Sequence, residues 1–415
     1  MIDFELSKGL EITQKLVHGV AQGLMRKWAR WADDHEHEKV QEYVNTMYVA
    51  QRSMDPASFG GGSKKKERKE GEPPKEKKVG TANMQMAIVI EELSWGDAGL
   101  YLQTPNSGLG GAAIGAAGTD EQKAKFLKRF TEGAPKWGAM AITEPGAGSD
   151  TAAISTTAVL DEKTKEWILN GEKIFVTQGK SAVEDTEGFV VVWATRDRKA
   201  GRAGIKSFLV DHHTPGMKVT KVEEKLGIKA SDTASIVFED CRIPYSNVLG
   251  DPEVKTGFKG AMATFDATRP MVAASALGIG RASLEFVKEA FGKAGIPMRY
   301  GVSTNKLTAR EKELMMMEAQ LQAARLLTWR AAWMADAGKP NNLEASMCKA
   351  KAGLAVTQVC QKAIELMGPV GYSKKELLEK WLRDAKINDI FEGTGQINML
   401  VVARRILDYT SKELK

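Results

Sequence analysis

The run GFVVVWATR, residues 188–196, places six consecutive apolar residues, mostly β-branched or aromatic, between a glycine and a polar end. This pattern is typical of a buried β-strand. Similar short runs, separated by turn residues, occur at 137–142, 166–170, 172–179, 205–213 and 234–240. Together they predict a small β-barrel or sandwich of roughly a hundred residues.

Helical patterns lie on both sides of these strands. On the N-terminal side, apolar residues recur at three- and four-residue spacing from Leu16 to Trp31, and the segments 85–99 and 121–129 continue the pattern. On the C-terminal side, long helical segments are expected near 255–293, 306–338, 343–368, 374–386 and 395–412. The order of helices, strands and helices is not that of a doubly wound sheet. We therefore predict an α+β protein with an N-terminal helical domain (1–135), a middle β domain (136–250) and a C-terminal helical domain (251–415).

A segment rich in glycine, proline and charge, DPASFGGGSKKKERKEGEPPKEKKVG, begins at Asp55. It holds too little apolar surface to offset the entropy of ordering, so a mobile charged insertion is predicted at 55–81. Lys64 to Lys78 carries eight basic and four acidic residues, which is +4 of the net charge of +6. The segment is either a docking patch for an acidic partner or a solvated insertion, and its composition favours the second reading.

Several classes of protein are disfavoured by what the sequence lacks. The remaining charge of +2 gives little support for a nucleic-acid-binding surface. Three cysteines without a CxxC pair suit a reducing compartment, and no apolar run approaches the roughly 18 residues of a membrane span. The start MIDFELS does not resemble a signal peptide, so a cytoplasmic protein is predicted. Neither HExxH nor GxSxG occurs, which disfavours a metal site and an elbow-type hydrolase.

Two glycine motifs loosely match the dinucleotide-binding fingerprint. Gly108–Ala113 is not preceded by a strand-like run, and Gly278–Gly280 lies inside a long helical pattern. Close packing of helices through small residues is the better interpretation of both.

Three segments carry candidate chemistry. AITEPGAGSD (141–150) leads from a strand into a turn whose amides and hydroxyls suit a planar heterocycle or a phosphate. GEKIFVTQG (171–179) puts Phe175 and Thr177 on one face of a strand, because side chains alternate along a strand. RDAKINDIFEGTGQ (383–396) sets Glu392 between an apolar Ile–Phe pair and a glycine-rich turn that opens a helix.

Each segment has an ordinary structural explanation, and Glu392 alone could be an acid favoured by a helix dipole. In this order, and with FDATRP at 265–270, they resemble the signature segments of the acyl-CoA dehydrogenase family from about Ala82 onward. The resemblance implies a C-terminal four-helix bundle and a homo-oligomer, either tetramer or dimer. It further implies a role in fatty acid metabolism, an acyl-CoA substrate and an electron-transfer flavoprotein as electron acceptor.

The resemblance also implies FAD as cofactor and a set of site residues. Those expected to contact FAD are Met140, Ala141, Ile142, Thr143, Ser149, Phe175, Val176, Thr177, Arg299, Thr394 and Gln396. Those expected to contact the substrate are Ser149, Asp266, Arg269 and Gly393. Glu392 would be the catalytic base that takes the α-proton of the thioester while flavin N5 accepts the β-hydride, giving a trans-2-enoyl-CoA. A carboxylate in an apolar pocket has a raised pKa, which makes it a stronger base.

Two departures from the family pattern leave other functions open. Pro297 stands where relatives carry an arginine that reaches the FAD pyrophosphate, and Glu365 replaces a glutamine near the adenine half. Arg299 is the candidate substitute for the missing arginine. One alternative is a flavoprotein of the same fold with other chemistry, of monooxygenase or desulfinase type or a DNA-associated homologue. Another is a non-catalytic partner subunit that has lost FAD.

Overall fold

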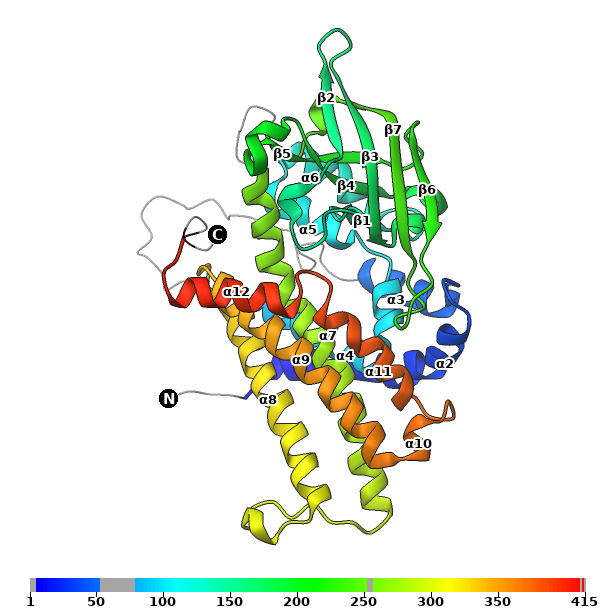
Figure 1. Cartoon of the computed structure of the whole chain (residues 1–415). Coiled ribbons are helices and arrows are strands. Elements are labelled where there is room, and N and C mark those ends of the chain that lie inside the picture. Colours follow the sequence, from blue (N-terminus) through cyan, green and yellow to red (C-terminus); the bar gives the residue numbers. More distant parts are fainter. Residues whose placement is uncertain (1–4, 53–78, 252–256, 411–412, 414–415) are drawn as a thin grey trace, which may run out of the picture.

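A computed structural model describes residues 5–52, 79–251, 257–410 and 413, and the predicted mobile insertion at 55–81 lies almost wholly outside them. The first helices are α1 (Lys8–Val20), a π-helical turn (Ala21–Met25), α2 (Arg26–Asp34) and α3 (Gln41–Arg52). They are followed by α4 (Ala82–Gln103), α5 (Gly108–Ala117) and α6 (Asp120–Phe126). In Figure 1, α2, α3 and α4 lie below the sheet, whereas α5 and α6 lie beside its strands.

The middle of the chain forms one curled seven-stranded sheet (Figure 1). Its strands are β1 (Gly138–Ala141), β2 (Thr157–Asp161), β3 (Glu166–Thr177), β4 (Phe189–Thr195), β5 (Ile205–Asp211), β6 (Met217–Val222) and β7 (Thr233–Pro244). The order across the sheet is β1-β4-β2-β3-β7-β6, with β5 paired to β4. All seven residues of β4 are buried, as its continuous apolar run predicted.

The C-terminal part is a bundle of long helices. It contains α7 (Gly257–Lys293), α8 (Ala309–Asp336), α9 (Asn342–Met367), α10 (Pro369–Tyr372), α11 (Leu378–Lys386) and α12 (Gly395–Ile406). Helix α7 runs from beside the sheet down into the bundle (Figure 1). Buried apolar residues of α7, α8, α9 and α11 share one core, which includes Leu277, Leu321, Val356 and Trp381. The predicted order of helices, sheet and helices is confirmed, whereas the domain boundaries after residues 135 and 250 stay a prediction.

The two glycine motifs serve packing, as predicted. A β-carbon on Gly110 would lie 2.4 Å from the carbonyl oxygen of Ala139, where α5 crosses β1. A β-carbon on Gly278 would lie 2.2 Å from the carbonyl oxygen of Glu91, where α7 crosses α4. Both distances are too short for any side chain, so these glycines allow elements to approach closely.

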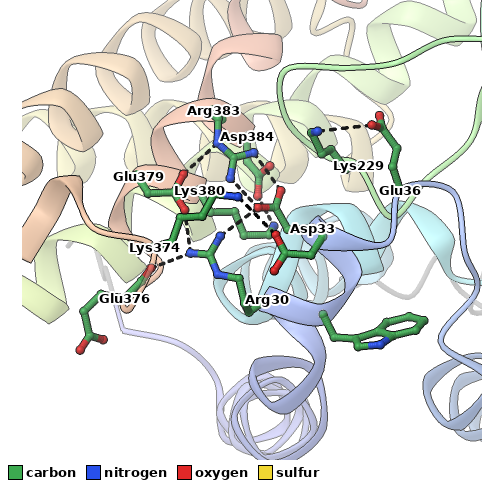
Figure 2. Close-up of polar contacts among 12 residues, drawn as sticks. Arg30, Asp33, Glu36, Lys229, Lys374, Glu376, Glu379, Lys380, Arg383 and Asp384 are labelled. Atoms are coloured by element: carbon green, nitrogen blue, oxygen red, sulfur yellow. Dashed lines mark hydrogen bonds and ion pairs between the residues drawn. The ribbon is translucent and has the colours of Figure 1, made fainter.

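Charged residues tie α11 to the other parts of the molecule (Figure 2). Arg383 donates to both carboxylate oxygens of Asp33 on α2, at 2.8 and 2.5 Å, and to Glu379 at 2.9 Å. It also donates to the carbonyl of Leu226 in the β6–β7 connection, at 3.0 Å. Because one guanidinium reaches three elements, Arg383 fixes the start of the 383–396 segment relative to α2 and the sheet.

A second set of charges lies deeper beside it. The Lys380 ammonium lies 2.6 Å from Asp97 and 2.5 Å from Asp384, and all three side chains are at most 2% exposed. Asp384 also accepts from the backbone N–H of Ile228 at 2.6 Å. The charges that join the domains, here called the interdomain network, are Arg30, Asp33, Asp97, Glu379, Lys380, Arg383 and Asp384.

Candidate active site

The loop that carries Glu392 lies between a short 3₁₀ turn (Ile387–Asp389) and α12, and its backbone is left-handed. Glu392 has φ 53° and Gly393 has φ 92°. A left-handed conformation costs a non-glycine residue about 1–2 kcal/mol, so Glu392 is strained where the glycine after it is not. The Gly393 carbonyl accepts from Lys349 Nζ at 2.5 Å and from Asn398 Nδ2 at 2.8 Å. Side chains of α9 and α12 therefore hold the turn in place.

The Glu392 carboxylate is packed among helices of the bundle. Thr268 on α7 donates its hydroxyl to Glu392 Oε2 at 2.5 Å. The next residue, Arg269, is 6% exposed and donates to Asp266 and to Ser346. Burial raises the pKa of the Glu392 carboxyl above its usual range, against the hydrogen bond from Thr268 and the charges of Arg269 and Lys349. A carboxylate in this state is a stronger base than one in water.

Lys349 is a member of this cluster that the sequence analysis did not identify. It is 1% exposed, and burial lowers its pKa to about 8, partly offset by the charges of Asp389 and Glu392. In the sequence it sits four residues after Ala345 and three before Ala352, both of which are buried. That spacing placed it on the apolar face of a helix, but a lysine stem can also cover such a face with its charge in water.

The second cluster lies where β1 and β3 end. The backbone N–H of Ile174 donates to the carbonyl of Thr143 at 2.9 Å and joins the two strands. Just beyond, Glu144 and Lys173 form a buried ion pair of 2.7 Å. Burial alone would raise the pKa of Glu144, but hydrogen bonds from Lys173 and Thr156 and the charge of Lys173 lower it to about 2. This pair anchors the Pro145–Gly146 turn against β3.

The Phe175 side chain is exposed at a shift in the register of β3. The pairing of β3 with β7 shifts register between Lys173 and Val176, and Phe175 has φ 58°. Its side chain is 60% exposed, whereas Val176 is 1% exposed. The hydroxyls of Thr143 and Thr177 donate to no acceptor within the described part of the chain. An exposed ring beside two free hydroxyls suits a flat, polar-edged heterocycle, so these residues fit the isoalloxazine of FAD.

The end of α4 adjoins both clusters. Gln178, directly after Thr177, donates its side-chain amide to the carbonyl of Leu102 at 2.8 Å. The neighbouring Tyr101 has a raised pKa, first because of burial and second because of the charge of Glu392. The strand that carries Phe175 and the loop that carries Glu392 therefore face the same end of α4.

The remaining predicted flavin contacts differ in how they are exposed. Ala141 is buried in the sheet core with Val176, so its side chain is not free for a ligand. Met140 and Ile142 are partly buried against Trp193. Ser149 and Gln396 are exposed. Thr394 caps α12 by accepting from the backbone N–H of Ile397 at 3.2 Å.

Arg299, the candidate substitute at the first departure from the family pattern, and Glu365, at the second, each pair with an opposite charge within the chain. Arg299 donates to both carboxylate oxygens of Glu311 at 2.7 Å, and the Glu311 side chain is only 2% exposed. Arg299 therefore already carries an ion pair within the chain, and its role as the substitute for the missing arginine stays a prediction. Glu365 pairs with Lys362 at 2.6 Å, which supplies a cation that offsets its negative charge.

Comparison with known proteins identifies the family of the chain. Models of the N-terminal, middle and C-terminal domains of acyl-CoA dehydrogenases match residues 74–134, 139–241 and 255–407. The mitochondrial short-chain specific acyl-CoA dehydrogenase of Rattus norvegicus is 40% identical over 331 residues, which is 79% of this chain and 77% of the relative. The chain belongs to the acyl-CoA dehydrogenase family.

Two further relatives span nearly the whole chain. A short-chain specific acyl-CoA dehydrogenase of Clostridium acetobutylicum is 34% identical over 414 residues, 98% of this chain and 100% of the relative. The structure of butyryl-CoA dehydrogenase from Megasphaera elsdenii matches with a TM-score of 0.83 and 30% identity, covering 98% of this chain and 100% of that one. The predicted fold class and the predicted FAD-dependent oxidoreductase are confirmed at the level of the family. Among the described residues, no helix is long and apolar enough to cross a membrane.

Proposed function

We propose that this acyl-CoA dehydrogenase converts a short acyl-CoA to the trans-2-enoyl-CoA, with Glu392 as the base that takes the α-proton. The observation that supports this most strongly is the environment of the Glu392 carboxylate. It is desolvated enough to raise its pKa, and it sits on a strained turn held by two side chains. Strained backbone and perturbed carboxylates gather at catalytic sites.

The proton would be received at one defined oxygen of Glu392. Thr268 occupies Oε2, and Oε1 has no hydrogen-bond donor within the described part of the chain. Oε1 is therefore free to take the α-proton. On protonation the carboxyl loses its charge, which relieves the cost of its burial and favours the transfer. The backbone N–H of Glu392 has no acceptor among the described residues and can donate to the thioester carbonyl.

FAD, when bound, supplies the two-electron acceptor for the β-hydrogen. Phe175 would stack on the ring, and Thr143 and Thr177 would bond its polar edge. Thr394 and Gln396, at the start of α12, would bind a more distant part of FAD. The backbones of Met140, Ala141, Ile142 and Val176, together with Ser149, complete the proposed flavin contacts.

The substrate and partners are proposed from the relatives. Two relatives are named as short-chain specific and a third as a butyryl-CoA dehydrogenase, so a short acyl chain is proposed here. Asp266, Arg269, Ser149 and Gly393 would line its site. An electron-transfer flavoprotein is the proposed electron acceptor. Exposed apolar residues on α12, among them Met399 and Leu400, support a homo-oligomer.

Anaerobic mixing with acyl-CoA tests this proposal. Purified yellow protein is mixed with a series from butyryl-CoA to palmitoyl-CoA, and the loss of oxidised-flavin absorbance is followed. We expect the fastest bleaching with the short thioesters. A yellow protein that no acyl-CoA bleaches would support a flavoprotein with other chemistry, and a colourless protein that does not take up FAD would support a non-catalytic subunit.

A further inference from the structure

The Glu392 turn depends on a buried cation whose role follows from its contacts. Lys349 comes from the middle of α9, and its ammonium has no room to reach solvent, since the residue is 1% exposed. A buried ammonium is costly unless it is paired or hydrogen-bonded. Within the described part of the chain its one hydrogen-bond acceptor is the Gly393 carbonyl, at 2.5 Å. This buried lysine therefore donates its hydrogen bond to the backbone carbonyl of the residue that follows Glu392.

The contact between Lys349 and the Gly393 carbonyl affects Glu392 in two ways. The first is mechanical, because the Gly393 carbonyl belongs to the left-handed turn that directs the Glu392 side chain. The second is electrostatic, because the ammonium lies close enough to the Glu392 carboxylate for each charge to act on the other. Asn398 Nδ2 holds the same carbonyl at 2.8 Å without a charge, so it provides the first effect alone.

We propose that Lys349 is a positioning residue for the base: it holds the Gly393 carbonyl and places a second buried positive charge, beside that of Arg269, next to the Glu392 carboxylate. This inference rests on the proposed role of Glu392. It gives Lys349 a function in the reaction although it need not touch the substrate.

The charged and titratable groups that face this pair come from several elements. They are Asp266 and Arg269 on α7, Tyr101 on α4, Asp389 in the 3₁₀ turn before Glu392, and Lys349 itself on α9. Arg269 is already offset by Asp266 through a 3.2 Å contact. If the Lys349 charge is lost, Arg269 is the remaining cation beside the Glu392 carboxylate among the described residues, and its charge is shared with Asp266.

The direction of the effect on pH dependence follows from the sign of that charge. A positive neighbour favours the ionised carboxylate and lowers its pKa, so removing it raises the pKa. The base acts only when ionised, so the rate rises as pH rises through this pKa. A neutral residue at position 349 should therefore move the acidic limb of the rate profile to higher pH.

The test is the pH profile of flavin reduction in a single turnover, with saturating butyryl-CoA and the FAD-loaded protein. Lys349→Met should move the midpoint of the acidic limb upward by about one pH unit and slow the plateau about tenfold to a hundredfold. Lys349→Arg keeps the charge and should keep the wild-type midpoint. Asn398→Leu is the matched control: it removes the uncharged donor to the same carbonyl, so it should slow the reaction without moving the midpoint.

Two results would overturn the inference. One is a folded Lys349→Met whose midpoint equals that of wild type, and the other is an Asn398→Leu midpoint that moves as far as that of Lys349→Met. If Lys349→Met does not fold, Lys349→Gln is measured instead, since its amide can donate to Gly393 without a charge; an unmoved midpoint there would equally overturn it. Failure of the proposed function is seen separately, because Glu392→Gln would then still bleach with butyryl-CoA.

Discussion

Lys349 and Lys380 are both fully buried lysines in the bundle, yet their surroundings differ in kind. Lys380 lies between two buried carboxylates, Asp97 and Asp384, and their charges raise its pKa. Lys349 has a neutral carbonyl as its hydrogen-bond acceptor, and burial lowers its pKa to about 8. Lys380 belongs to the interdomain network, and Lys349 belongs to the cluster around Glu392.

The comparison shows how one stretch of sequence serves two purposes. Arg383 pairs with Asp33 of α2, and Asp384 pairs with Lys380 of α11, which also pairs with Asp97 of α4. Eight residues later, Glu392 is held by one hydroxyl and two partly shared cations, and its pKa remains raised. The paired charges of Arg383 and Asp384 fix the position of the segment. The Glu392 carboxylate near its end lacks such a direct ion pair among the described residues, and its raised pKa suits it to take up a proton.

The largest expected effect is on catalysis. Glu392→Gln keeps the size of the side chain but removes the base, so flavin reduction by butyryl-CoA should slow by about a thousandfold or more. Its thermal midpoint should stay at or above that of wild type, because a desolvated charge has been removed. Stopped-flow absorbance and a thermal melt measure the two quantities. A Glu392→Gln variant that is both active and less stable than wild type would mean that Glu392 stabilises the fold and is not the base.

The reverse outcome is expected for the interdomain network. Lys380→Met leaves Asp97 and Asp384 buried without their cation, which should cost about 3–5 kcal/mol of unfolding free energy. Denaturant unfolding measures this loss. The protein that remains folded should keep the wild-type pH midpoint of flavin reduction. A stability loss near zero would mean that the network is not needed to join α4 and α11.

Acid unfolding should depend on the buried ion pair between Glu144 and Lys173 of β3. Glu144 has a folded pKa of about 2, below its ordinary value of 4.5. A lowered folded pKa gives stability that is present above pH 4.5 and is lost as pH falls toward 2. Glu144→Gln should therefore be less stable than wild type at neutral pH, with the difference shrinking as the pH falls. Unfolding midpoints measured at several pH values would show this, and a constant difference would count against the pairing.

The smallest expected effect concerns the exposed ring of β3. Phe175→Ala removes the stacking surface but none of the hydrogen bonds proposed for FAD, so FAD affinity should weaken by about 0.5–1.5 kcal/mol, or roughly twofold to tenfold in Kd. Titration of apoprotein with FAD, read by flavin fluorescence, measures the change. Leu226→Ala is a control at an equally exposed apolar residue on a loop of the same domain, and it should leave the affinity unchanged.

Much of this arrangement could be predicted from the sequence. The continuous apolar run of β4 and the long periodic segments of the bundle specified their elements, because burial on both faces or on one stripe leaves a local pattern. Glu392 alone had an ordinary structural explanation, and only the resemblance of its segment to the acyl-CoA dehydrogenase family made it the candidate base. Local patterns therefore predicted the fold, and the resemblance predicted the base.

The contacts around Glu392 could not be predicted, because they join residues far apart in the chain. Thr268 lies 124 residues before Glu392, and tertiary packing makes it the hydrogen-bond donor to the Glu392 carboxylate. The pairing of Arg299 with Glu311 and the register shift beside Phe175 likewise depend on neighbours brought in by tertiary packing. Hydrophobic periodicity in the sequence does not predict such contacts.

The central claim is that Glu392 removes the α-proton, and hydrogen exchange tests that step apart from the redox step. An acyl-CoA analogue with sulfur at the β position has α-hydrogens but no β-hydrogen, so it can lose a proton without reducing the flavin. Incubated with the FAD-loaded protein in heavy water, it should gain deuterium at the α-carbon, measured by mass spectrometry. Wild type should catalyse this exchange and Glu392→Gln should not. Equal exchange by the two proteins would contradict the assignment of the base.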